Sequence, residues 1–134
     1  MKTLPFILRE GFWAGGSEPG SNLLPRPITA EKAWKGKRVF LKALTYIEQS
    51  TQVHAEHYKD WSTCRVCEMI NGSQDFRFES MNITWKWPSG YTHYVKIHNV
   101  RPSLAFQEFI TLAYELMRSP LGKIENQKIK KSKN

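Results

Sequence analysis

Two pairs of metal-ligating side chains constrain this sequence more than any other feature. Cys64 and Cys67 are the only cysteines of the chain, and 25 residues separate Cys67 from His93, which is followed by His98. A Cys-x2-Cys turn directs two thiolates at one point, and a His-x4-His pair on a helical turn can do the same with two imidazoles. Zn²⁺ prefers four such ligands in a tetrahedron, and sites closed by four protein ligands are structural. The spacing therefore predicts a structural zinc site with no open position for a catalytic water.

The length and composition of the chain are those of a small globular domain. It has 134 residues, of which 40% are hydrophobic and 24% are charged. A chain of this size builds a modest core that benefits from a metal cross-link. Neither an export signal nor an apolar run of about 20 residues is evident, and two cysteines at metal spacing suit a reducing compartment. These features predict a cytoplasmic protein with no membrane partner.

The N-terminal segment is predicted to be an extended strap. Glycines and prolines recur throughout residues 1–28, which leaves no room for a long helix or strand. The same segment is too apolar for a free tail. We therefore expect it to lie over the domain with Phe12 and Trp13 buried.

A helix is predicted over residues 29–50. Its apolar residues follow helical spacing, and Thr29 is a candidate N-cap, but Gly36 weakens the first part, so the firm part of the helix is expected at about residues 36–50. A polar connection follows and carries the other two histidines of the chain, His54 and His57. Either these histidines add to the metal site or they are ordinary linker residues.

Residues 58–100 are predicted to form a zinc module. The module is expected to begin with the cysteine knuckle and a turn at residues 71–73. Two strands follow, over residues 76–80 and 83–87, joined by a turn at residues 80–82. A helix over residues 90–99 ends the module, and a further helix is expected over residues 103–118. This order predicts an α+β fold in which a zinc knuckle, a β-hairpin and a ligand-bearing helix, of treble-clef or enlarged ββα type, are flanked by an N-terminal and a C-terminal helix. The expected domain spans residues 1–121, and residues 122–134 are expected to form a basic, disordered tail.

The positive charge lies at the edges of the sequence. The formal net charge is +8, and residues 118–134 hold six basic residues and one acidic residue, a net of five. A second basic cluster lies in the predicted N-terminal helix. Such clusters are either solvated surface or contacts for phosphates. The candidate nucleic-acid contacts are Lys35, Lys37, Arg38, Lys42, Lys128, Lys130 and Lys131.

Two motifs resemble those of a known group of proteins. Residues 61–67 read Trp-Ser-Thr-Cys-Arg-Val-Cys, and residues 87–102 read Trp-Pro-Ser-Gly-Tyr-Thr-His-Tyr-Val-Lys-Ile-His-Asn-Val-Arg-Pro. Both are similar to segments of a group of small bacterial and phage proteins, through a Trp-Ser-x-Cys-Arg-x-Cys knuckle and a Trp-Pro-x-Gly-x-x-His-Tyr-Val-x-x-His-x-Val-Arg-Pro segment. The resemblance supports the four metal ligands and carries no activity with it. In a phage, the protein would work in the host cytoplasm.

The sequence favours a binding protein over an enzyme. It contains no glycine-rich phosphate loop and no nucleophile elbow, and a histidine that closes a structural zinc site is not free to activate water elsewhere. We therefore predict no catalytic residue and no small-molecule substrate. The first hypothesis is a zinc-stabilised protein that binds nucleic acid through the basic helix and tail. The second is a protein-binding adaptor or inhibitor of a host factor, and a metal-dependent nuclease is a distant third. Arg65 and Arg101 lie beside the module and either pair with acidic residues or face a partner.

Overall fold

The structure is a computed structural model that describes residues 6–14 and 23–119, with the backbone alone for residues 58–61. The elements are β1 (Ile7–Arg9), α1 (Lys37–Glu48), β2 (His54–Thr63), β3 (Ile70–Ser80), β4 (Ile83–Pro88), α2 (Tyr91–His98) and α3 (Leu104–Arg118). The fold is therefore mixed α+β, as predicted, with a helix on each side of the predicted module in the sequence. The helices within the described residues are too short and too polar to cross a bilayer.

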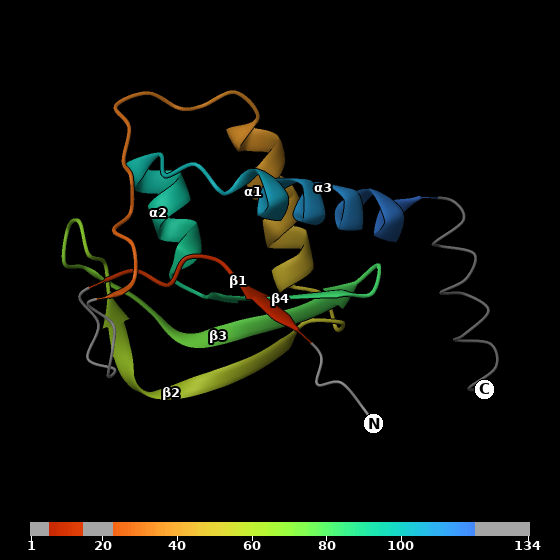
Figure 1. Ribbon diagram of the computed structural model, residues 1–134, viewed down its shortest axis with the longest axis horizontal. Helices are drawn as coiled ribbons and strands as arrows, with labels where there is room; N and C mark the ends of the chain where they lie inside the picture. Colours follow the sequence, from red (N-terminus) through yellow and green to blue (C-terminus); the bar gives the residue numbers. More distant parts are fainter. Residues whose placement is uncertain (1–5, 15–22, 120–134) are drawn as a thin grey trace.

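The strands form one sheet in the order β1-β4-β3-β2. β2, β3 and β4 are antiparallel neighbours, whereas β1 pairs parallel with β4. Figure 1 shows the three helices on one face of this sheet. The turn between β3 and β4 contains Met81 and Asn82, both with positive φ (54° and 60°), the backbone that a tight two-residue hairpin requires. The predicted hairpin and its turn are therefore confirmed.

The main core lies between the sheet and helices α1 and α3. Phe76 and Phe78 alternate with polar residues along β3, and Trp85 and Trp87 do the same along β4, so all four side chains are buried against the helices. From α3, Phe106 meets both tryptophans, with ring centroids 5.0 Å and 5.4 Å away. Because burying one large apolar side chain is worth about 1.5–3 kcal/mol, this aromatic layer is a main source of stability.

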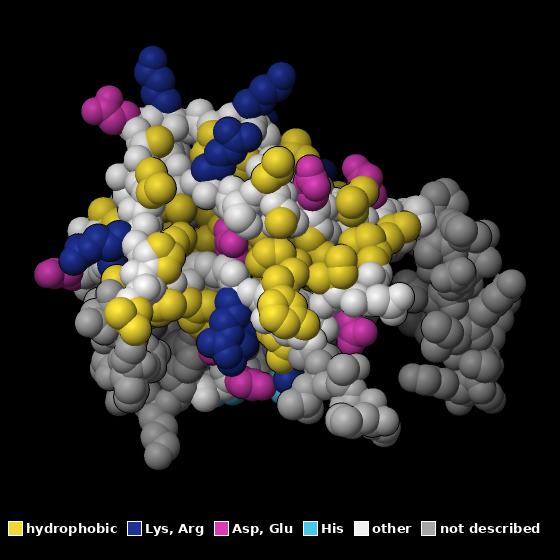
Figure 2. All heavy atoms as spheres, in the orientation of Figure 1, with side chains coloured by type: hydrophobic (Ala, Val, Ile, Leu, Met, Phe, Trp, Pro, Cys, Tyr) yellow, Lys and Arg dark blue, Asp and Glu magenta, His cyan; other side chains and the backbone are white. Residues whose placement is uncertain are grey.

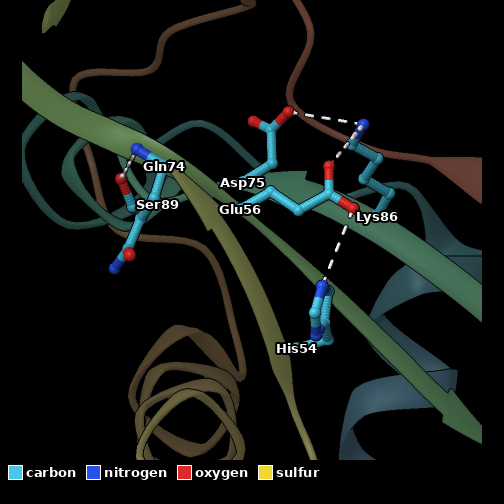
Figure 3. Close-up of polar contacts among 6 residues, drawn as sticks. All are labelled: His54, Glu56, Gln74, Asp75, Lys86 and Ser89. Carbon is cyan, nitrogen blue, oxygen red and sulfur yellow. Dashed lines mark hydrogen bonds and ion pairs between the residues drawn. The ribbon is translucent and has the colours of Figure 1, made fainter. Parts of the chain in front are cut away.

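The opposite face of the sheet is polar. Glu56 of β2, Asp75 of β3 and Lys86 of β4 meet there, and Figure 3 shows the Lys86 ammonium between the two carboxylates. Its Nζ lies 3.5 Å from Asp75 Oδ2 and 3.9 Å from Glu56 Oε2. An antiparallel sheet with one covered and one solvated face shows this alternation of residue types.

Several predicted boundaries are wrong. The helix expected from residue 29 begins at Lys37, and its N-cap is Gly36 in the left-handed conformation (φ 92°), so Thr29 is not the cap. Residues 71–73, predicted as a turn, lie inside β3. The polar connection that carries His54 and His57 is the first part of the edge strand β2. In each case strand pairing or a glycine conformation outweighed the local pattern.

The two helices near the C-terminus agree with the sequence. α2 spans Tyr91–His98 within the predicted residues 90–99. α3 begins after Ser103, whose Oγ accepts a hydrogen bond from the Phe106 N–H at 3.2 Å, as an N-cap does. The tail at residues 122–134 lies outside the described residues.

Glu10 connects the N-terminal strap to α2 and to the start of α3. Its carboxylate accepts hydrogen bonds from Tyr91 Oη (3.0 Å), from the Ser103 N–H (2.7 Å) and from Ser103 Oγ (2.9 Å). Burial, and then the nearby charge of Glu10, raise the pKa of Tyr91, so its hydroxyl remains a donor. The strap contributes the short strand β1, which the sequence did not predict, and Phe12 and Trp13 are half-buried rather than fully buried.

Candidate metal centre

Four side chains from two elements far apart in the sequence converge at one end of the sheet. Cys64 and Cys67 lie in the turn between β2 and β3, and His93 and His98 lie on α2. Their ligand atoms all lie within 4.8 Å of one another, and Cys67 Sγ is 3.3 Å from His93 Nε2. In tetrahedral zinc sites, bonds of about 2.0–2.3 Å place ligand atoms about 3.3–3.8 Å apart. The four residues are therefore close enough to hold a metal ion.

The cysteine turn is held by its own backbone. The Cys64 N–H donates to the Met69 carbonyl at 2.8 Å, and the Glu68 N–H donates to the Cys64 carbonyl at 2.9 Å. Glu68 has a positive φ of 64°, which closes the turn. The Val66 N–H points at Cys64 Sγ from 3.4 Å, a contact that stabilises a thiolate. The turn thus presents one buried sulfur, that of Cys64, and one exposed sulfur, that of Cys67.

Tyr94 connects the helix to the cysteine turn. It lies on α2 between the two histidines, and its hydroxyl accepts a hydrogen bond of 2.7 Å from the Arg65 N–H. Burial raises the pKa of Tyr94, which keeps the phenol neutral. This contact sets the distance between the turn and α2, and therefore between the two ligand pairs. Sequence reasoning assigned no role to Tyr94, although it lies between His93 and His98 and is a fixed position of the His-Tyr-Val motif.

The two imidazoles are suited to bind a cation. Burial, and then the adjacent His98 ring, lower the pKa of His93, which favours the neutral form that ligates metals. The ring centroids of His93 and His98 are 5.1 Å apart. His98 Nε2 is buried and has no hydrogen-bond partner. Buried polar atoms are nearly always satisfied, so a buried nitrogen without a partner fits the role of a metal ligand.

A small second core shields the inner side of the centre. Cys64, Tyr94 and Val100 are buried together there, and Trp13 of the strap packs against them. The Trp13 and Tyr94 rings meet edge to face with centroids 5.8 Å apart. The strap thus covers the centre on the Cys64 side, while Cys67 remains exposed.

The other two histidines of the chain, His54 and His57, lie outside this centre. The cluster of possible metal ligands within the described residues consists of the four side chains of the centre and includes neither His54 nor His57. His54 Nε2 is 3.9 Å from the Glu56 carboxylate on β2 (Figure 3). The open question about these two histidines is therefore answered in favour of ordinary surface residues.

The predicted nucleic-acid contacts fall into three groups. Lys35, Arg38 and Lys42 are exposed at and just before α1. Lys37 is instead a structural residue, because its Nζ donates to the Lys96 carbonyl at 2.9 Å and to Asn99 Oδ1 at 2.5 Å. Lys128, Lys130 and Lys131 lie outside the described residues.

The two arginines left open by the sequence have distinct surroundings. The Arg65 guanidinium donates to the backbone carbonyl of Thr63, within the cysteine turn. The Arg101 guanidinium lies over the Trp34 ring, 5.8 Å from its centroid. Neither arginine forms an ion pair within the described part of the chain.

Comparisons of the chain with family models, with curated proteins and with solved structures find no match. The function is therefore inferred from the geometry of the centre and from the surface around it.

Proposed function

We propose that the protein is a non-catalytic, zinc-stabilised binding protein that associates with nucleic acid. The observation that carries the zinc proposal is the convergence of two thiols and two imidazoles within 4.8 Å. Bound zinc would cross-link the turn after β2 to helix α2. The order of knuckle, β3–β4 hairpin and ligand-bearing helix supports the proposal that the centre is of treble-clef type.

A closed ligand set argues against catalysis at this centre. Four protein ligands fill a tetrahedral zinc ion and leave no position for a water or a substrate. A metal-dependent nuclease would need at least one of the two histidines for a second role. Both are directed at the cysteines, with His93 Nε2 3.3 Å from Cys67 Sγ. Zinc here would therefore stabilise the fold.

Nucleic-acid binding is supported by the exposed face of α1. Arg38 and Lys42 are four residues apart and share one side of the helix, and Lys35 lies in the segment just before it. None of these three cations joins an ion pair formed among the described residues. Unpaired cations at the start of one helix suit phosphates, because binding releases counterions from the nucleic acid.

The zinc proposal is tested by metal analysis of the purified protein and of two ligand variants, Cys67→Ser and His93→Ala. We expect one zinc per chain, and a cobalt-substituted protein with the absorbance of tetrahedral thiolate coordination. Both signals should be lost in the two variants. The matched control is His54→Ala, which removes an exposed imidazole from β2 and should retain both signals. Zinc that persists in His93→Ala would refute the proposed ligand set.

Nucleic-acid binding is tested by the salt dependence of affinity for a labelled duplex. For each phosphate neutralised, the logarithm of the binding constant should fall by about 0.9 per logarithmic unit of salt. The variant Lys35→Gln/Arg38→Gln/Lys42→Gln should show a smaller slope. No binding by the wild type at low salt would refute this part of the proposal.

A protein partner is the second candidate, and one observation favours it. Val66, Met69 and Ile70 are exposed apolar side chains at the cysteine turn, with 44%, 62% and 64% of their surfaces accessible. Apolar side chains grouped at a rigid turn suit contact with another protein. Binding through this turn would be nearly independent of salt, which separates it from binding to phosphates.

A further inference from the structure

Two segments that lie side by side at the C-terminal end of α2, residues 30–38 and 96–101, are rich in basic residues. Lys32 and Lys35 come from the segment before α1, Arg38 from the first turn of α1, Lys96 from α2 and Arg101 from the connection to α3. We call these five residues the α2-end cluster. All five are exposed. Figure 1 places the end of α2 and the start of α1 along the upper edge of the molecule, where Figure 2 shows Lys and Arg side chains projecting into solvent.

Hydrogen bonds bring these segments together, although the bonded residues are 59 to 69 positions apart in the sequence. The Ala30 N–H donates to the His98 carbonyl at 3.2 Å, and the Asn99 Nδ2 donates to the Ala30 carbonyl at 3.1 Å. The Lys37 ammonium donates hydrogen bonds to the Lys96 carbonyl and to Asn99 Oδ1. A cation at the C-terminal end of a helix also complements the helix dipole. These bonds fix the segment before α1 against the last turn of α2.

Stacking holds the fifth member in place. The Arg101 guanidinium lies 5.8 Å from the centroid of the Trp34 ring, within the range of a cation–π contact. Trp34 directly precedes Lys35 in the sequence, so this contact places Arg101 beside the lysines of that segment. The side chain of Arg101 is therefore pre-positioned, which lowers the entropy that it loses on binding.

The charge of this region is one-sided. Residues 30–38 and 96–101 together contain six basic residues and one acidic residue, Glu31, for a net charge of five. The ion pairs found in the described ranges involve none of the six. Protein interfaces are depleted of charge at their centre, whereas phosphate contacts concentrate Lys and Arg. A run of phosphates therefore matches this surface better than a protein does.

We propose that the α2-end cluster is the surface that contacts the phosphate backbone of nucleic acid, and that the metal centre holds this surface in shape. The link is His98, whose ring belongs to the candidate metal centre while its carbonyl accepts the Ala30 N–H. Metal bound by the ring would fix the last turn of α2, and with it the segment that carries Lys32 and Lys35. The inference rests on the proposed nucleic-acid binding and adds Lys32, Lys96 and Arg101 to its residues.

The experiment measures the affinity of a labelled duplex of mixed sequence by fluorescence anisotropy across a range of salt. The test variant is Lys96→Gln/Arg101→Gln, in which both changes are at exposed side chains. Its matched control is Arg9→Gln/Arg77→Gln, which removes the same charge from exposed positions on β1 and β3. If each removed cation costs one phosphate contact, the salt slope falls by about 1.8. With equal affinities at about 1 M salt, the variant then binds about 60-fold more weakly than wild type at about 0.1 M. The control should change both values far less.

The outcomes separate the two proposals. Wild type that fails to bind at low salt refutes the proposed function and this inference together. Wild type that binds, with equal losses in the test and control variants, refutes the inference alone. An acidic polypeptide that binds the wild type more tightly than the duplex, with the same loss in the test variant, would also overturn the phosphate assignment.

The role of the metal is tested in the same assay with Cys67→Ser. This change lies in the cysteine turn and removes no basic side chain, so affinity should fall only if the metal orders the cluster. We expect at least a tenfold loss, and we expect the Lys96→Gln/Arg101→Gln variant to retain the cobalt absorbance. If metal-free Cys67→Ser binds the duplex as tightly as wild type, the proposed role of the metal is refuted. The charge variants then test the phosphate surface independently.

Discussion

A buried carboxyl group, that of Glu48, gives the stability of this protein a specific dependence on pH. Glu48 is the last residue of α1, and its Oε2 accepts a hydrogen bond of 2.8 Å from Trp87 Nε1 on β4. Its Oε1 accepts from Thr92 Oγ1 of α2 at 3.4 Å. Burial raises the pKa of Glu48 to about 7, and these two hydrogen bonds offset only part of the rise. The Glu48 side chain thus joins α1 to β4 and α2, and its ionisation lowers the stability of the folded protein.

The sign of the effect follows from the two states. The pKa is 4.5 for an ordinary glutamate and about 7 in the folded protein, so the folded state holds the proton more tightly. The contribution of this group to stability is therefore fully present below about pH 4.5 and is lost as the pH rises through 7. A pKa shift of this size corresponds to about 3 kcal/mol in the free energy of unfolding. Between pH 5 and pH 8, about 2 to 3 kcal/mol of it should be lost.

The perturbation is Glu48→Gln, which keeps the shape and the acceptor for Trp87 but cannot ionise. Urea unfolding of wild type and variant at pH 5 and pH 8 gives the free energy of unfolding of each. The variant should gain about 2 to 3 kcal/mol relative to wild type on going from pH 5 to pH 8. Glu115→Gln, an exposed position on α3, is the matched control and should show no such gain. A difference between Glu48→Gln and wild type that is equal at both pH values would refute the reasoning.

Three further changes have expected outcomes of their own. Gly11→Ala should lower the free energy of unfolding by about 2 kcal/mol or more, because Gly11 has φ +81° and an added Cβ would lie 2.6 Å from Tyr91 Cδ2. Thermal denaturation checks this, and an unchanged midpoint would contradict it. Ser103→Ala removes the N-cap of α3 and should cost about 1–2 kcal/mol in urea unfolding, where a loss below the error of the method would argue against the cap. Tyr94→Phe removes the hydroxyl that accepts the Arg65 N–H, and it should weaken zinc binding about tenfold, measured in competition with a chelator. Equal zinc affinity would show that the cysteine turn keeps its position without this hydrogen bond.

Much of the candidate centre could be predicted from the sequence because its signals are local. The spacing of Cys64 and Cys67 is set by one turn, and that of His93 and His98 by one short helix. Ser103 marks the start of α3 through its own hydrogen bond, and Met81-Asn82 closes a hairpin between adjacent strands. Each of these features depends on residues within a few positions of one another. Because these features are short-range, they can be predicted without the tertiary structure.

The elements that the sequence did not reveal depend on distant partners. β1 exists because three residues of the strap pair in parallel with β4, about 77 positions later in the chain, and nothing in its own pattern requires this. β2 carries polar residues because it is an edge strand with a solvated face, so its pattern resembles a linker. α1 starts only at Lys37, after the left-handed Gly36, and the segment before it instead bonds to the end of α2.

By itself, the sequence determined the four candidate ligands, the hairpin and the two C-terminal helices, because each follows from short-range spacing. Only the tertiary structure showed that the ligand atoms meet, and that His98 connects the centre to the segment before α1. It also gathered Lys96 and Arg101 with the lysines of a segment more than 60 residues away. The physical reason is that chain topology, rather than local propensity, decides which side chains share a surface.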